Sequence, residues 1–282
     1  MLEHRGQFPV QLMCEVLKVS RSGYYAWIER PPSERQERAM KLTEQIRAAH
    51  EQSRRSYGSP RVTAELRGAG MAVCENTVAK LMRQAGIRAK AKRRYVPRTT
   101  DSNHSYPIAP NRLDRHFTAA GPDRKWTCDI TYVATDQGWL YLAVVMDLFS
   151  RKIVGWSMRD HLRGELVSEA LEMALLRRRC PAAGLLHHSD RGVQYACGDY
   201  RKLLEKHGIE CSMSRRGNCY DNAVMESFFG TLKTELVHQN HYAMHAQAKA
   251  SIFEWIECWY NRRRRHSSLG YLSPEAFEAK LN

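Results

Sequence analysis

The 282-residue chain lacks several features that would assign it to common classes of protein. No apolar run approaches the roughly 18 residues that a membrane-spanning helix needs, and no signal-peptide pattern follows Met1. The eight cysteines contain no Cys-x-x-Cys pair, which argues against a zinc site or a disulfide framework. These absences predict a reduced, cytoplasmic protein with no membrane segment.

Acidic residues are few relative to basic ones. The chain has 30 Asp and Glu against 44 Lys and Arg, a formal charge of +14, and a pI near 9.6. Residues 30–98 alone hold 17 Lys and Arg against six Glu, so most of the excess charge is concentrated there. A strongly basic protein usually has an acidic partner, and nucleic acid is the commonest one. A basic ribosomal or membrane-surface protein is the alternative.

Composition divides the chain into four parts: a short helical segment (1–30), a basic helical region (31–98), a basic irregular linker (99–118) and a larger domain (119–282). In the second part, we predict helices at Glu34–Gln52, Ser59–Leu66 and Glu75–Gln84. The last two flank a glycine turn, which is the pattern of a DNA-reading helix-turn-helix. An ordinary αα-hairpin with a solvated basic face is the alternative. The candidate DNA contacts are Arg61, Asn76, Thr77, Lys80 and Arg83.

The larger domain has the pattern of an α/β protein. Three predicted strands come first, and two more alternate with helices, which indicates a mixed sheet covered by helices. The predicted strands are Trp126–Ala134, Trp139–Met146, Ile153–Met158, Gly184–Ser189 and Ile209–Ser212.

Three carboxylates in this domain suggest metal chemistry. Asp129 lies mid-strand, Asp190 follows a strand end, and Glu226 lies on a helix that we expect Asp221 to cap. Mg²⁺ prefers such oxygen ligands, and two such ions can activate the attacking oxygen and stabilise the leaving one at a phosphodiester. Lys233 lies seven residues after Glu226, on the same helix face, and could hold a phosphate. Taken singly, Asp190 could be a helix cap and Glu226 a solvated residue.

The motifs around these carboxylates resemble a known family: the catalytic OrfB product of frameshifting bacterial insertion sequences, which are relatives of retroviral integrase. The residues that carry the resemblance are Thr127–Tyr132, His188–Tyr195, Asp221–Phe229, Trp259–Asn261 and Arg265–Glu275, with Ser20–Tyr25 and Ser59–Gly86 nearer the amino terminus. It covers nearly the whole chain.

The resemblance implies a ribonuclease-H-like core, a mixed five-stranded sheet flanked by helices, in which Asp129, Asp190 and Glu226 form a DDE triad. The triad would bind two Mg²⁺ ions, for which Mn²⁺ could substitute, and would catalyse 3′-end cleavage and strand transfer. Lys233 is then a contact to the terminal DNA, and Gln194 belongs to a Gln-Tyr pair whose Tyr195 could equally serve packing. The expected partners are double-stranded DNA, comprising terminal inverted repeats and target DNA, further copies of the chain on that DNA, and the upstream OrfA product or its frameshift fusion. The expected location is the bacterial cytoplasm, in association with the nucleoid.

The chain also departs from the wider group. It has no His/Cys zinc-binding module at its amino terminus and no sustained leucine heptad. We therefore expect the chain alone to bind DNA weakly and to be catalytically poor. Two alternatives remain: a ribonuclease-H-like nuclease that does not join DNA, and an inactive DNA-binding regulator of transposition.

A run of four arginines, Arg262, Arg263, Arg264 and Arg265, follows a helix that carries Trp255 and Trp259. Positive charge at a helix C-terminus is favoured by the helix dipole. Four consecutive arginines more often touch DNA phosphate as well, so all four are candidate DNA contacts.

Overall fold

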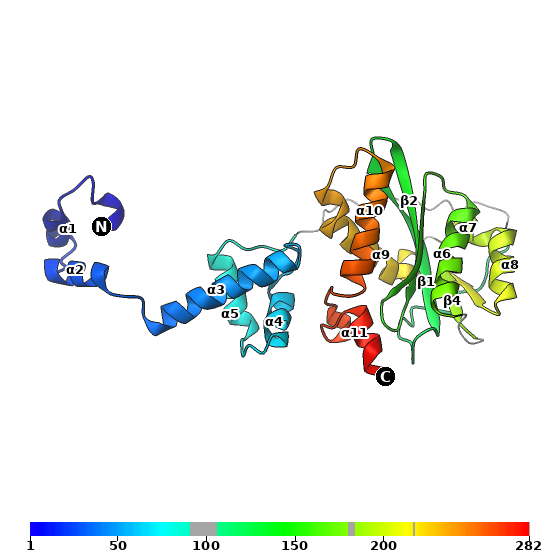
Figure 1. Ribbon diagram of the computed structural model, residues 1–282, viewed down its shortest axis with the longest axis horizontal. Coiled ribbons are helices and arrows are strands. Elements are labelled where there is room, and N and C mark those ends of the chain that lie inside the picture. The colour runs from blue at the N-terminus through cyan, green and yellow to red at the C-terminus, as the bar shows by residue number, and fades with distance from the viewer. Residues whose placement is uncertain (91–105, 180–183, 217, 282) are drawn as a thin grey trace.

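The structure, a computed structural model, describes residues 1–90, 106–179, 184–216 and 218–281. The chain forms three units in sequence order: a small amino-terminal pair of helices, a three-helix unit, and an α/β domain (Figure 1). Within the described ranges, no helix combines the length and apolar character needed to cross a bilayer.

The amino-terminal unit consists of η1 (Leu2–His4), α1 (Val10–Val16) and α2 (Arg21–Glu29). Ser20 caps α2 by accepting a hydrogen bond from the amide of Gly23 at 3.0 Å. The Tyr24 side chain is buried between the two helices, and an extended segment then leads to the next unit.

The three-helix unit contains α3 (Glu34–Gln52), α4 (Ser59–Gly68) and α5 (Glu75–Gln84), close to the predicted bounds. Local signals explain this agreement. Ser33 and Gln36 form a capping box at the start of α3, and Pro60 occupies the first turn of α4. In α5, Val78, Leu81 and Met82 are buried against the other two helices, as their spacing predicts.

The α/β domain is built on a five-stranded mixed sheet in the order β3-β2-β1-β4-β5. β1 pairs antiparallel with β2 and parallel with β4, and β4 pairs parallel with β5. The sheet thus places β1 at its centre, and it confirms the mixed five-stranded prediction. The strands are β1 (Lys125–Thr135), β2 (Gly138–Asp147), β3 (Ile153–Arg159), β4 (Leu186–Ser189) and β5 (Glu210–Met213).

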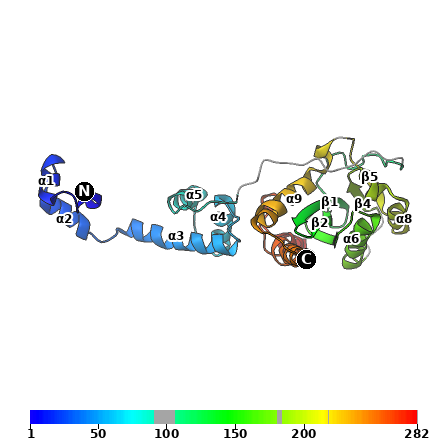
Figure 2. The same cartoon turned by 90° about the horizontal axis from the view of Figure 1, so that it is seen from above.

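Helices cover both faces of the sheet (Figure 2). One face packs on α6 (Gly164–Arg177), α7 (Val193–Ala196) and α8 (Gly198–Lys206). Gly155 is required there, since an added Cβ would lie 2.0 Å from the carbonyl oxygen of Ala170 on α6. The other face packs on α9 (Ala223–Glu235), α10 (His245–Glu254) and η4, a π-helical stretch (Trp255–Tyr260).

Short helices complete the domain: η2 (Cys219–Asn222), η3 (Val237–Gln239), η5 (Ser267–Leu269), α11 (Pro274–Glu278) and η6 (Ala279–Leu281). The expectation that Asp221 caps α9 is wrong. Asp221 lies inside η2, and its buried carboxylate accepts hydrogen bonds from Arg215, Arg115 and Asn111. The Arg215 guanidinium holds the pKa of the Asp221 carboxyl far below its usual range.

The segment that precedes the α/β domain is partly packed on it. Of the predicted linker 99–118, residues 99–105 lie outside the described residues. Further along, Leu113 is buried, and the amides of Arg112 and Leu113 donate to the Ser212 hydroxyl at 2.9 and 3.2 Å. The structured part of the domain therefore begins before residue 119.

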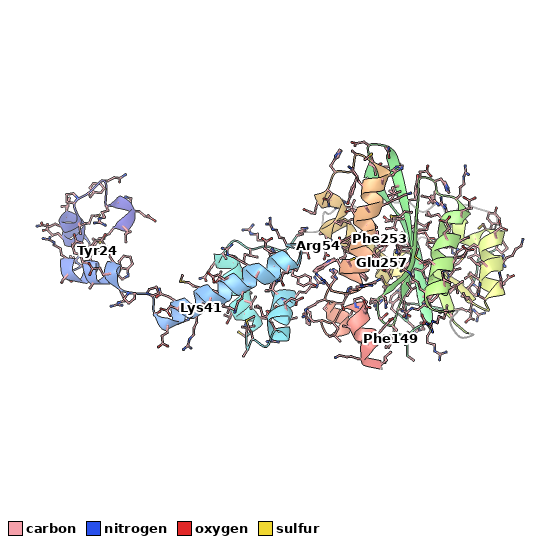
Figure 3. All side chains as sticks on the ribbon, viewed as in Figure 1. Tyr24, Lys41, Arg54, Phe149, Phe253 and Glu257 are labelled. Atoms are coloured by element: carbon pink, nitrogen blue, oxygen red, sulfur yellow. The ribbon has the colours of Figure 1, made fainter. Side chains whose placement is uncertain are left out.

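The three-helix unit docks on the α10–η4 side of the domain. Tyr57 packs against Trp259 with ring centroids 5.8 Å apart, so the two cores form one hydrophobic cluster. Arg54, two residues after the end of α3, pairs with Glu254, and its guanidinium lies 5.3 Å from the centroid of the Trp259 ring. Figure 3 shows Arg54 at the junction of the two units. Arg265 adds a charged contact to Glu65 of α4, at 2.8 Å.

Candidate active site

Asp129 lies near the middle of β1, where its carboxylate is half-buried. It shares a sheet face with Val133, which packs on the α9 side, so Asp129 also points toward α9. Its Oδ1 atom accepts a hydrogen bond from the amide of Ile130 at 2.7 Å. The central strand thus provides a fixed carboxylate beneath α9.

Asp190 is set beside Asp129 by the strand register. In the parallel pair β1–β4, Thr127 lies opposite His188, and the same register continued by two residues places Asp190 next to Asp129. Neighbouring strands lie about 5 Å apart. Asp190 directly follows β4, and its Oδ1 atom accepts from the amide of Gly192 at 2.9 Å.

Glu226 lies on the first turn of α9, and its side chain is exposed. The start of α9 is anchored to β1 by Asn222, whose Oδ1 accepts from the Thr127 hydroxyl at 2.7 Å and whose Nδ2 donates to the Cys128 carbonyl at 3.2 Å. These two bonds reach the residues directly before Asp129, so Asn222 fixes where Glu226 can lie relative to the strand. We did not single out Asn222 from the sequence, although it lies in the Asp221–Phe229 motif.

The three carboxylates interact electrostatically. Burial raises the pKa of Asp129 well above its ordinary value, and the negative charges of Asp190 and Glu226 raise it further. The Ile130 amide and the Lys233 ammonium act in the opposite direction. The carboxylates predicted from three separate elements are therefore near one another, at a site that favours added positive charge.

Lys233 is the cation on the same side of α9. Its Nζ lies 5.5 Å from the centroid of the Tyr132 ring, on β1. Burial lowers the pKa of Lys233, and the nearby Asp129 partly offsets this. A half-buried ammonium beside the carboxylates can hold a phosphate as a point charge.

The donor set fits Mg²⁺, which prefers oxygen ligands. In the described ranges, no three His, Cys, Asp or Glu side chains form a closed group around one ion position. Mg²⁺ does not require such a group, because it keeps several waters and is usually bound through one or two carboxylates plus substrate phosphate. Asp129 with Asp190, or Asp129 with Glu226, could serve as such a pair.

The predicted helix-turn-helix contacts fall into two groups. Asn76, Thr77, Lys80 and Arg83 are all exposed on α5, on the side away from its buried residues. Arg61, by contrast, is directed into the protein: its Nε donates to the Arg265 carbonyl at 3.0 Å, and its guanidinium lies over the Tyr57 ring.

The arginine run is also divided. Arg262 and Arg263 are exposed. Arg264 is only 4% exposed and binds the buried Glu235 carboxylate, with its NH2 2.7 Å from Oε1 and its Nε 3.0 Å from both oxygens. Arg265 bonds Glu65 and the Tyr271 carbonyl. The side chains of the last two arginines thus join parts of the protein, and Arg262 and Arg263 are the exposed members of the run.

The Gln-Tyr pair lies beside the second aspartate. Gln194, on α7, is half-buried, and its Nε2 donates to the Leu162 carbonyl at 3.2 Å. Tyr195 is 2% exposed and packs edge-on against Tyr200 with centroids 5.5 Å apart. Tyr195 is a packing residue of the α6–α8 face.

Comparison with known proteins identifies the class. The family model for the integrase core domain matches residues 119–219, a second integrase core model matches 207–274, and an HTH-like domain model matches 37–95. The α/β domain is therefore a ribonuclease-H-like integrase core, the catalytic fold of polynucleotidyl transferases.

Closely similar proteins narrow this to a family. Transposase InsF of insertion sequence IS3A from Escherichia coli (strain K12) is 46% identical over 280 residues, which cover 99% of this chain and 96% of InsF. A 31 kDa protein of insertion element IS600 from Shigella sonnei is 47% identical over 270 residues, covering 96% and 98%. Among solved structures, the HTLV-2 integrase catalytic core domain in complex with magnesium matches with a TM-score of 0.43 and 15% identity, over 56% of this chain and 98% of that one. The chain belongs to the family of insertion-sequence transposases that includes InsF, as its motifs suggested.

Proposed function

We propose that this transposase cleaves the 3′ ends of its insertion sequence and transfers them to a new DNA phosphate, with Asp129, Asp190 and Glu226 as its catalytic, metal-binding residues. One observation carries this assignment. The charges of Asp190 and Glu226 act on Asp129, although the three residues come from a strand, a loop and a helix. Three carboxylates close enough to affect one another, in a chain of formal charge +14, suit a site that binds cations and works on a polyanion.

The chemistry divides between the bound ions and the chain. Two Mg²⁺ ions, when bound, would supply activation of the attacking oxygen and stabilisation of the leaving oxygen. Mn²⁺ is expected to substitute, since it accepts similar oxygen ligands. Asp129 and Asp190 would hold metal from the rigid sheet, Glu226 would hold it from α9, and Lys233 would bind a neighbouring phosphate of the terminal DNA. The oxygen of water, and then the freed 3′-OH, acts as nucleophile, so no Ser or Tyr of the chain attacks the DNA.

DNA recognition falls to the basic helical unit. Asn76, Thr77, Lys80 and Arg83 form the outward face of α5, which would enter the major groove of the terminal inverted repeat. Arg262 and Arg263 are exposed and remain candidate phosphate contacts to element or target DNA. We also propose that several copies assemble on the DNA, because two element ends must be joined together.

The test uses labelled element-end DNA and Mg²⁺, with the wild type compared with Glu226→Gln. The amide keeps the shape of the side chain but cannot bind the metal as an anion. Joining is expected to be lost, by more than about 10²-fold, while DNA binding measured by fluorescence anisotropy is retained. Strand transfer by the variant at the wild-type rate would refute the assignment of Glu226.

The same assay separates the alternative functions. Cutting without joining by the wild type would indicate a nuclease, and binding without cutting would indicate a regulator. Glu205→Gln, on the exposed surface of α8, is the matched control because it removes the same charge far from the site.

The upstream OrfA product is a further proposed partner. We expect the OrfA–OrfB frameshift fusion to cleave element ends faster than this chain, because the fusion adds DNA-binding and multimerising segments. Equal end cleavage by the two proteins, at equal concentration, would contradict this.

A further inference from the structure

A cleft of about 520 Å³ separates the three-helix unit from α9. One wall is the outer face of α9, with Ser227, Gly230, Thr231 and Thr234. The opposite wall comes from the segments around α4 and after α5, with Gly58, Arg61 and Lys90, and the floor includes Arg264 and Tyr271. The proposed mechanism uses none of these residues, although the cleft begins one residue from Glu226.

The lining has the chemistry of a phosphate-binding site. Its ionisable side chains include three cations, Arg61, Lys90 and Arg264, against one carboxylate, Glu235. The charge of Glu235 is already neutralised by Arg264 through hydrogen bonds of 2.7 to 3.0 Å. The surplus positive charge therefore comes from Arg61 and Lys90, and serine and threonine hydroxyls surround it.

Within the described part of the chain, the bonds that hold Arg61 and Lys90 in place use only part of their donor capacity. Arg61 uses its Nε in the bond to Arg265, and a guanidinium has five N–H donors. Lys90 donates from Nζ to the Glu235 carbonyl at 3.0 Å, which uses one of its three donors. Burial lowers the pKa of both side chains, and the charge of Arg264 lowers that of Arg61 further, so an anion in the cleft would stabilise the charged form of each.

We propose that this cleft binds the phosphate backbone of the DNA strand that enters the active site, which rests on the proposed function of the triad. The path is set by α9. Glu226 and Lys233 lie along one face of that helix, and Ser227, Thr231 and Thr234 lie along the adjacent face. A strand that leaves the carboxylates can therefore follow the same helix into the cleft.

The length of this wall sets how many nucleotides it covers. Thr234 lies seven positions after Ser227 on α9, a rise of about 10 Å. One strand of DNA carries a charge about every 3.4 Å along its axis, so the wall matches about three phosphates next to the reacting one. The strand backbone, rather than its bases, would contact the hydroxyls and cations, and the contact would be independent of sequence.

The test is a double-mutant cycle between Lys90→Gln and the DNA. Duplexes made from the inverted repeat that flanks the gene carry one uncharged methylphosphonate at each of six positions beside the cleavage site. We expect the methylphosphonate to weaken DNA binding by the wild-type protein about tenfold at one to three adjacent positions. At those positions it should not change DNA binding by the Lys90→Gln variant. The slope of log K against log salt should also become shallower by about 0.9 in the variant.

Two further variants keep the result interpretable. Lys206→Gln, on the exposed surface of α8, removes the same charge and should leave the salt slope and the methylphosphonate pattern unchanged. Thr234→Asp places a negative charge in the cleft without removing the Lys90 bond, and should weaken binding most at the same positions.

The outcomes separate this inference from the catalytic assignment. If Lys90→Gln and the methylphosphonate affect the free energy of DNA binding independently at every position, the cleft is not a phosphate site. That conclusion holds even if the wild-type protein joins DNA. Position-specific coupling in a protein that does not join DNA would support the cleft and refute the catalytic proposal. A uniform loss of binding together with a lower Tm would show that Lys90 is only structural, which also overturns the inference.

Discussion

Replacing Arg264 by methionine would leave the Glu235 carboxylate buried without its two-pronged partner. Glu235 and Arg264 are 7% and 4% exposed, so water cannot compensate for the loss. Among the residues that the structure describes, the remaining side-chain hydrogen bond to this carboxylate comes from the indole of Trp259, whose Nε1 donates to Oε2 at 3.4 Å. Breaking one side of a buried ion pair typically costs about 3–5 kcal/mol, since the other charge stays desolvated.

The double replacement should behave differently from either single one. With Glu235→Leu and Arg264→Met together, neither charge of the pair is left, and such apolar replacements are typically neutral or stabilising by about 1–4 kcal/mol. The expected coupling between the two positions is therefore several kcal/mol. Equilibrium unfolding in guanidinium chloride, followed by tryptophan fluorescence, measures the four proteins of this cycle.

Two results would refute this reasoning. Single variants within about 1 kcal/mol of wild type would mean that the pair is as weak as an exposed one. A folded double variant with a shallower salt dependence of DNA binding would mean that Arg264 contacts phosphate after all, because the buried pair predicts an unchanged slope. Arg262→Gln, whose side chain is exposed, is the comparison expected to reduce the slope.

Two other contacts give predictions of the same kind. Glu65→Arg should release the three-helix unit from the α/β domain by repelling Arg265, and the reversed pair Glu65→Arg/Arg265→Glu should restore docking at least in part. Small-angle X-ray scattering should report a larger radius of gyration for the single variant only. A larger radius of gyration for both variants would contradict this prediction. Asp221→Asn should lower the free energy of unfolding by about 1.5–3 kcal/mol at pH 7, because charge-assisted bonds to Arg215 and Arg115 are lost. The depressed pKa of Asp221 means that this difference is present above about pH 4 and shrinks as the pH falls further. A difference that grows on acidification would show the sign to be wrong.

Local signals in the sequence were sufficient to predict most of the helices and strands. Caps and glycines defined α3 and α5, whose bounds match the prediction at both ends, and alternation of apolar residues defined β1 around Asp129. Caps, turns and apolar alternation depend on residues only a few positions away, so they can be recognised in a single sequence. The motif resemblance then supplied the convergence of the three carboxylates, which spacing alone could not.

Contacts between distant residues explain what the sequence did not reveal. In a run of four arginines, the sequence cannot say which side chains turn inward, and the partners Glu235 and Glu65 lie 29 and 200 residues away. Asp221 was expected to cap α9 because it precedes it, but Arg115, 106 residues earlier, forms part of the pocket that holds it. Each of these charged groups has a partner that comes from another element.

The position of Asn261 has a consequence for folding during synthesis on the ribosome. Its side-chain amide accepts from the Ile153 amide at 2.9 Å and donates to the Ile153 carbonyl at 3.0 Å, as a neighbouring strand would. β3 is one of the two edge strands of the described sheet, and an open edge invites pairing with other chains. The two residues are 108 positions apart, and synthesis proceeds at about 5–20 residues per second. The edge at Ile153 therefore stays uncovered for several seconds or more on the ribosome, which makes nascent chains of this transposase most vulnerable to self-association before the last helices emerge.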